Sequence, residues 1–99
     1  MRIYISGKIS GLEPSEYREK FRAAEEHLRA QGHDVINPAI MDVYNLSWAE
    51  FMAVDGVLVG ISDAIYMLDN WQDSNGAKME KEQAEKLGRK IMYEREMLA

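Results

Sequence analysis

Short apolar runs alternate with longer helical stretches along this chain, and this alternation limits its folding more than any other feature of the sequence. Within the first helical stretch, Tyr17, Phe21, Ala24 and Leu28 recur at intervals of three and four positions, which is typical of one face of a helix. Strands that alternate with helices favour right-handed crossovers, which give a parallel sheet with helices on both faces. We therefore expect an α/β fold.

The predicted elements fill a single domain over residues 1–99. The predicted strands are Ile3–Ser6, Asp34–Asn37, Asp63–Leu68 and Arg89–Tyr93. The predicted helices run from Pro14 or Ser15 to a stop at Gly32, from Ser47 to about Gly60, and from about Gly76 to Leu87, with Gly88 at the end. Residues 39–46 are expected to form a loop or a short turn, and the tail 94–99 has no assignment. These elements predict a Rossmann- or flavodoxin-like domain of three layers, with about four parallel strands in the order 2-1-3-4.

Composition argues against several classes of protein. A net charge of −5 makes a nucleic-acid polymer a poor partner, because phosphate neutralisation needs a basic surface. There is no cysteine for a disulfide or a thiolate, and His27 and His33 lack partners at metal-ligand spacing, so no metal site is predicted. No apolar run approaches the roughly 18–20 residues that span a membrane. We expect a soluble cytoplasmic protein with no membrane partner, and for so short a chain we expect a homodimer or higher homo-oligomer.

Two carboxylates fall on helix faces that should be buried. With about 3.6 residues per turn, Glu80 shares a face of the last helix with Ala77, Ala84 and Leu87. The apolar face of the middle helix is centred on Asp55 and is made by Trp48, Phe51, Met52, Leu58 and Val59. Burial of an ionised carboxylate costs several kcal/mol unless it is paired. The two acids are therefore either paired core residues or members of a site, and perturbed carboxylates cluster at active sites.

Glu80 also has the better position for chemistry. In parallel sheets of this kind, ligands bind at the carboxyl ends of the strands, and the last helix starts from that edge. Glu80 lies in the first two turns of this helix, where the amino-terminal dipole favours the ionised form. An ionised carboxylate in a pocket can act as a nucleophile, as it does in retaining glycosidases.

Three loop features on the same edge have two readings each. The run from Ser6 to Gly11 is either a phosphate cradle or an ordinary turn, and it matches neither the Walker A nor the GxGxxG pattern. The run from Ser74 to Gly76 caps the last helix, binds an anion there, or does both. Trp71 is either a lid over a base or a packing residue. Asp63 is expected to be a structural turn acid.

Several spaced elements together resemble one known family. The elements are Tyr4-Ile5-Ser6-Gly7 in the first strand, Asp55 ahead of the Ser62-Asp63 pair, the run from Ser74 to Glu80, Ala84, and the strand entry Lys90-Ile91. From Tyr4 to Ile91 the chain resembles the nucleoside 2-deoxyribosyltransferase superfamily, which includes the 2′-deoxynucleoside 5′-phosphate N-hydrolases. Short members of this type are common in phage and prophage.

The resemblance implies hydrolysis or transfer at an N-glycosidic bond. Glu80 would attack the anomeric carbon to give a glycosyl-enzyme, Asp55 would move a proton to or from the base, and Tyr4 would orient the nucleophile. The implied substrate-binding residues are Ser6, Gly7, Lys8, Asn37, Trp71, Ser74 and Gly76. Ser74 stands where the nucleotide hydrolases carry a serine that contacts phosphate, which favours a 5′-phosphorylated ligand. The implied partner is a small nucleoside or nucleotide, and no cofactor is implied.

Departures from the family pattern keep two other interpretations open. Ser10 replaces an arginine of the hydrolases, Lys81-Glu82 follows Glu80 where the family has Leu-Gly, and a later strand has no match. The first alternative is a nucleotide-binding module without catalysis. The second is a structural subunit of an oligomer, in which Glu80 and Asp55 have no ligand.

Overall fold

The computed structural model describes residues 1–97 and contains one sheet with helices around it. The strands are β1 (Arg2–Ser6), β2 (Asp34–Ile36), β3 (Ala64–Met67) and β4 (Lys90–Tyr93). The α-helices are α1 (Pro14–Ala30), α2 (Trp48–Gly60), α3 (Asn75–Lys86) and α4 (Glu94–Met97). Two 3₁₀ helices, η1 (Pro38–Val43) and η2 (Trp71–Asp73), lie in the connections.

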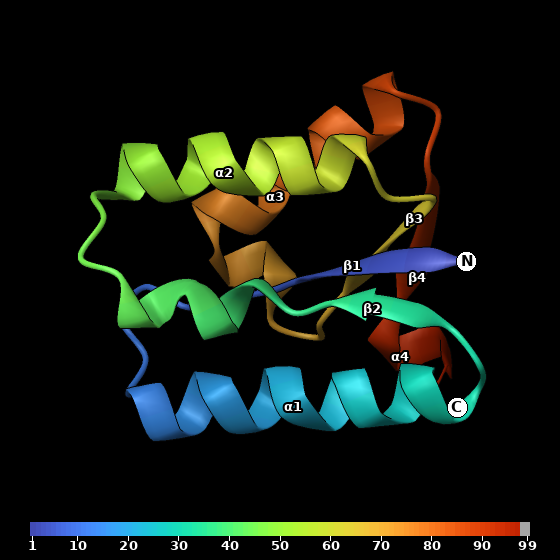
Figure 1. Cartoon of the computed structure of the whole chain (residues 1–99), viewed down its shortest axis with the longest axis horizontal. Coiled ribbons are helices and arrows are strands. Elements are labelled where there is room, and N and C mark those ends of the chain that lie inside the picture. Colours follow the sequence, from blue (N-terminus) through green and yellow to red (C-terminus); the bar gives the residue numbers. More distant parts are fainter. Residues whose placement is uncertain (98–99) are drawn as a thin grey trace.

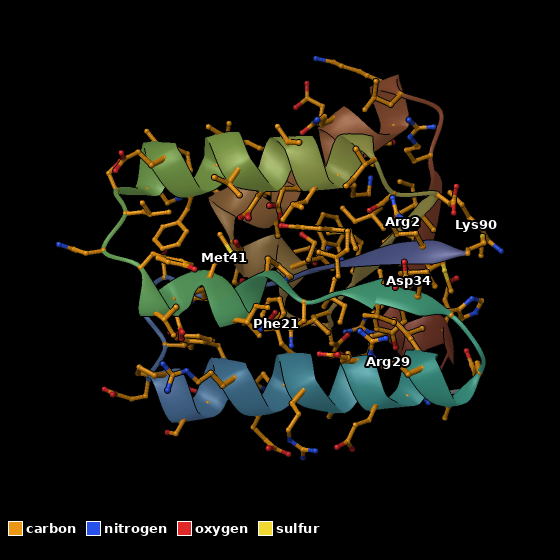
Figure 2. The ribbon with its side chains drawn as sticks, viewed as in Figure 1. Arg2, Phe21, Arg29, Asp34, Met41 and Lys90 are labelled. Carbon is orange, nitrogen blue, oxygen red and sulfur yellow. The ribbon has the colours of Figure 1, made fainter. Side chains whose placement is uncertain are left out.

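The sheet has the predicted topology. All three strand pairs are parallel and the order is β2-β1-β3-β4. Ile3 is in register with Val35 of β2 and with Ala64 of β3, so β1 lies in the middle of the sheet. At the amino-terminal edge, Arg2 and Asp34 form an ion pair of 3.2 Å across β1 and β2 (Figure 2). The prediction of a parallel α/β domain in the order 2-1-3-4 is confirmed.

Helices cover both faces of the sheet, which gives three layers (Figure 1). On one face α1 packs its predicted apolar stripe on the sheet, and Figure 2 shows Phe21 between this helix and the sheet. On the other face α2 and α3 pack together, with a second core that includes Tyr4, Ile65 and Ala84. Alternate residues of β1 point to opposite faces, so Ile3 and Ile5 join the first core whereas Tyr4 joins the second.

The helix ends follow the signals in the sequence. Gly32 and Gly88 have φ of 90° and 71°, and in each case the next residue donates its N–H back to the carbonyl five positions earlier, as in a Schellman ending. The capping box of α2 is complete, since Ser47 Oγ accepts from the Glu50 N–H at 3.1 Å and Glu50 Oε1 accepts from the Ser47 N–H at 2.8 Å.

Several element boundaries differ from the prediction. β3 starts at Ala64, because the Asp63 carboxylate accepts the Arg2 N–H at 2.8 Å and acts as the expected turn acid. β2 ends at Ile36, because Asn37 turns the chain into η1 and its side chain accepts the Ala39 N–H. The segment expected to be a loop or turn is thus largely helical. The tail forms α4 as far as Met97, and Leu98 and Ala99 lie outside the described residues.

Two expected core contacts are absent. Leu87 is 46% exposed, because α3 ends at Lys86 and Leu87 lies in its C-cap, and Trp48 is 51% exposed at the first turn of α2. Of the apolar face predicted for α2, only Val59 is fully buried. The amino-terminal half of this helix does not reach the sheet and instead borders a cavity. No helix within residues 1–97 is long and apolar enough to cross a membrane.

Candidate active site

A cavity of about 830 Å³ lies at the edge of the sheet where β1 ends and α1 and α2 begin. In Figure 1 this edge of the sheet is on the left. The walls of the cavity come mainly from β1 and the loop after it, the first half of α1, the η1 segment, the first half of α2 and the first two turns of α3. This is the edge at which parallel α/β sheets bind ligands. Aromatic and aliphatic side chains line most of it, and the polar groups gather around Glu80 and the start of α3.

Glu80 is held at the floor of this cavity by two hydroxyl groups. Tyr4 Oη donates to Glu80 Oε2 at 2.7 Å, and Ser6 Oγ donates to Glu80 Oε1 at 2.7 Å. Both donors come from β1, two positions apart, so they project from the same face of the sheet toward α3. The Glu80 side chain is only 5% exposed. One donor on each oxygen fixes the plane of the carboxyl group and stabilises its ionised form.

Asp55 stands beside this carboxylate on α2. It is half-buried and lines the cavity, and its Oδ1 is buried without a protein hydrogen-bond partner. A buried oxygen without a partner is costly in a native structure unless a ligand, water or proton satisfies it. Asp55 and Glu80 therefore form one acidic pair contributed by neighbouring helices.

The pair has perturbed protonation. Burial raises the pKa of Glu80 to about 7, and the negative charge of Asp55 adds to this although Ser6 and Tyr4 oppose it. Burial also raises the pKa of Asp55 to about 6, partly offset by Glu80 and Tyr4. Desolvation, together with the two acids, raises the pKa of the Tyr4 hydroxyl well above its ordinary value, so this group keeps its proton. Two coupled acids of this kind hold one proton between them near neutral pH.

The loop after β1 approaches the sheet closely at Gly7. A β-carbon at this position would lie 2.6 to 2.9 Å from side-chain atoms of Leu68, so only glycine fits. Lys8 follows, and its backbone N–H donates to Asn70 Oδ1 at 3.0 Å. Gly7, Lys8 and Ser10 all line the cavity, so the tight turn brings a cation and a hydroxyl group to its edge.

The start of α3 forms another part of the wall. Ser74 is the N-cap, and its Oγ accepts the Ala77 N–H at 3.1 Å. The amides of Asn75 and Gly76 belong to the first turn, which has no intrahelical acceptors. A β-carbon on Gly76 would lie 3.3 Å from Met52 Sδ, so glycine here lets α2 approach the helix start. Ser74, Asn75 and Gly76 all line the cavity.

Three of the predicted substrate-binding residues do not lie in the cavity wall. Ser6 is fully buried beneath Glu80 and acts on it directly. Asn37 is not part of the cavity wall, since its side chain caps η1 and donates to Glu25 Oε1 at 3.0 Å. Trp71 is also outside the wall and packs against Tyr93 with ring centroids 6.0 Å apart, which is the packing alternative for this residue.

Sequence reasoning missed the wall formed by η1 and α1. Asp42 lines the cavity and accepts hydrogen bonds on Oδ2 from Tyr17 Oη at 2.6 Å and from Arg18 Nε at 2.7 Å. Both donors, with the hydrogen bond from Arg18 the larger effect, lower the pKa of Asp42. Asp42 belongs to a 3₁₀ segment without periodicity, so no pattern in the sequence pointed to it.

Fold and site together define a Rossmann-like parallel α/β domain with a buried carboxyl pair at its ligand-binding edge. The chain belongs to the family described as Domain of unknown function (DUF4406), whose model matches residues 1–93. The match covers every residue of the site. Comparison with curated proteins gives no match. Comparison with solved structures gives none either.

Proposed function

We propose that this protein cleaves the N-glycosidic bond of a (deoxy)nucleoside 5′-monophosphate, with Glu80 as the nucleophile. The observation that carries the proposal is the geometry of Glu80, a buried carboxylate at the floor of a cavity with a hydroxyl donor on each oxygen. The two hydrogen bonds orient the carboxylate. No lysine or arginine within the described residues pairs with it, so a structural ion pair does not explain its burial. The resemblance to the nucleoside 2-deoxyribosyltransferase superfamily supports the same role.

The reaction has two displacements at C1′. A Glu80 oxygen bonds to C1′, the C1′–N bond breaks, and its electron pair goes to the base nitrogen, which takes the Asp55 proton. Water then attacks C1′ and gives a proton to Asp55, the hydroxyl group joins the sugar, and Glu80 leaves as a carboxylate. If a second base replaces water, the product is a new nucleoside 5′-monophosphate. Two inversions retain the configuration at C1′.

The reaction requires an ionised Glu80 and a protonated Asp55, and the hydrogen bonds of these two residues favour that state. Glu80 receives two donated hydrogen bonds, which favour its ionised form, whereas Asp55 Oδ1 has no donor. These hydrogen bonds favour the proton on Asp55, where the leaving base needs it, whereas burial acts the other way, because it raises the pKa of Glu80 to about 7 and that of Asp55 to about 6. The reaction uses the state in which Glu80 is ionised and Asp55 is protonated. Tyr4 keeps its proton and acts as a donor throughout.

The start of α3 is the proposed place for the phosphate. Its first-turn amides and the helix dipole attract an anion, and Ser74 and Gly76 border the cavity there. Lys8 lines the same cavity and supplies a positive charge from the loop after β1. A 5′-phosphate at this helix start would leave the sugar over Glu80.

A direct assay tests the proposal. The protein is incubated with the common 2′-deoxynucleoside and ribonucleoside 5′-monophosphates and with the unphosphorylated nucleosides, and free base is measured by chromatography. We expect base release from at least one monophosphate and its loss in Glu80→Gln. Glu82→Gln is the matched control, because Glu82 is exposed on the same helix and pairs with Lys86. No base release across the whole panel would contradict the proposal.

The second candidate is a nucleotide-binding module that does not turn over its ligand. The pKa of about 7 for Glu80 favours it, because a substantial fraction of the nucleophile is then protonated at neutral pH. This candidate predicts heat of binding for nucleoside monophosphates in calorimetry, the same affinity in Glu80→Gln, and no free base after prolonged incubation.

A further inference from the structure

Apart from Glu50 and Asp55, α2 consists of apolar residues and glycine, yet only Val59 is fully buried. Six of the nine large apolar residues that are exposed within the described part of the chain fall between Ile40 and Ile61. A helix that is apolar all round is normally buried in a core or in an interface. Since only Val59 of α2 is fully buried in this chain, the remaining surface of the helix needs a second explanation.

The inner side of α2 is already occupied by the rest of the fold. The Gly56 carbonyl accepts a hydrogen bond from Gln83 Nε2 of α3 at 2.8 Å, Asp55 faces Glu80, and Val59 packs in the core. The opposite side carries Ala49, Ala53, Val57 and Ile61 at intervals of four, and we call this stripe the outer α2 face. All four residues are exposed, Val57 by 64% and Ile61 by 53%. In Figure 1, α2 lies along the upper margin of the molecule.

Charge limits what can cover the outer α2 face. The segment from Ser47 to Ile61 contains no lysine or arginine, and the whole chain carries a net charge of −5. A membrane-surface helix needs basic residues beside its apolar face to meet anionic lipid, and nucleic acid needs them still more. The covering surface is therefore a protein surface, and it must be largely apolar.

We propose that this surface is the same face of a second copy, and that two copies pair through antiparallel α2 helices. A two-fold axis between Ala53 and Val57 sets Ala53 opposite the second copy's Val57, and Ala49 opposite its Ile61. Each small side chain then meets a large one, which is how helices interlock at close distance. A parallel pairing would instead set Ile61 on Ile61 and Ala49 on Ala49.

The same pairing avoids a clash of charges. Glu50 is exposed on the outer α2 face itself, at an angle between those of Val57 and Ile61, and in the antiparallel arrangement it lies opposite the second copy's Gly60. A β-carbon on Gly60 would have no protein atom outside the local backbone of the helix within 4 Å, so there is free space at this position. The interface is isologous, as is usual in two-fold homodimers. This inference does not rest on the proposed catalytic function.

The first test compares the mass in solution of the unmodified chain with that of a double variant of the outer α2 face. The chain has a mass of 11.4 kDa, so light scattering after size exclusion should give twice that, 22.8 kDa, when loaded at about 100 μM to allow for a small interface. Val57→Glu with Ile61→Glu should return the mass to 11.4 kDa. Ala23→Glu is the control, because Ala23 is exposed on α1, which packs on the other face of the sheet, and it should leave the dimer intact.

Cross-linking tests the orientation and does not depend on disruptive variants. The chain has no cysteine, so introduced thiols are the only targets of a short bismaleimide. Ala49→Cys mixed with Ile61→Cys should cross-link, whereas Ala49→Cys alone should not, because the two copies of position 49 lie at opposite ends of the contact. Ala23→Cys on the exposed side of α1 should give no cross-link. A monomeric mass for the unmodified chain, or cross-linking of Ala49→Cys alone to the same extent as the mixture, would overturn the proposal.

Discussion

Ser6 and Glu80 are separated by 74 positions in the sequence, yet their side chains meet in a buried hydrogen bond of 2.7 Å. The bond joins the central strand to α3, and the parallel bond from Tyr4 gives Glu80 a second anchor on the same strand. A carboxyl group is therefore part of the packing between sheet and helix. This means that its protonation affects the stability of the fold as well as any chemistry at the cavity.

Glu80→Gln should change how stability depends on pH. The folded protein keeps the Glu80 proton up to a pKa of about 7, whereas the unfolded chain releases it near the ordinary value of 4.5. The folded state binds more protons between these values, so this group makes the protein less stable as pH rises through that window, by up to about 3 kcal/mol. The variant has no carboxyl group and should lose this part of the slope.

Urea unfolding at several pH values measures this effect, over a range of about pH 4 to 8 that spans both pKa values. The free energy of unfolding of the unmodified protein should fall relative to that of Glu80→Gln as pH rises. Asp55 titrates in the same direction and is coupled to Glu80, so the difference between the two curves reports the titration of the pair. Two parallel curves would show that Glu80 is not the titrating group.

Tyr4→Phe should weaken catalysis more than it weakens the fold. The ring stays in the core, and only the hydroxyl that donates to Glu80 Oε2 is lost, so the free energy of unfolding should drop by about 1–2 kcal/mol. With one donor fewer, the ionised form of Glu80 is less favoured and its pKa rises further. The acid limb of the pH profile for base release should move to higher pH, with turnover reduced about tenfold or more.

Tyr66→Phe is the control for this experiment. Tyr66 is as deeply buried as Tyr4 but points into the core on the other face of the sheet. The Tyr66→Phe variant should have the same pH profile for base release as the unmodified protein. An equal shift of the acid limb in both variants would mean that the hydroxyl of Tyr4 has no special effect on Glu80.

The sequence was most informative where a periodic pattern or a local cap determines the structure. The apolar stripe of α1, the capping box at Ser47 and the glycine stops at positions 32 and 88 all depend on neighbours within a few residues. The same periodicity placed Glu80 on a buried face, and burial of Glu80 is observed. These features are local, so they can be read from a single sequence without knowledge of the packing.

Features that depend on contacts between distant segments could not be read in this way. The periodicity of α2 indicated an apolar face for the core, but the helix borders a cavity and an open surface, so Trp48 is exposed. Asp42 reaches the cavity wall only because η1 folds against α1, where Tyr17 and Arg18 hold it. Neither arrangement leaves a pattern within its own segment.

Gly7→Ala should destabilise the fold although the change is a single methyl group. The added carbon would lie 2.6 Å from Leu68 Cδ1 and 2.9 Å from Leu68 Cβ, and the latter is too close to the backbone to move aside. We expect a loss of about 1–3 kcal/mol in the free energy of unfolding, as for other overpacked cores. Gly60→Ala is the control, because no atom outside the local backbone of the helix lies within 4 Å of the added carbon, and helix propensity favours alanine there. Thermal unfolding of both variants decides the question, and an unchanged melting temperature for Gly7→Ala would contradict the predicted contact.

Ser74→Ala separates the structural role of the α3 cap from its proposed role in phosphate binding. The variant loses the acceptor for the Ala77 N–H, so the free energy of unfolding should fall by about 1 kcal/mol. Ser47→Ala removes the equivalent cap of α2, where Ser47 accepts the Glu50 N–H at 3.1 Å, and should cost about as much stability. Only Ser74 lines the cavity. Calorimetry with a nucleoside and its 5′-monophosphate should therefore show that Ser74→Ala lowers the preference for the phosphorylated ligand, whereas Ser47→Ala leaves it unchanged. An equal preference in both variants would place the phosphate away from the start of α3.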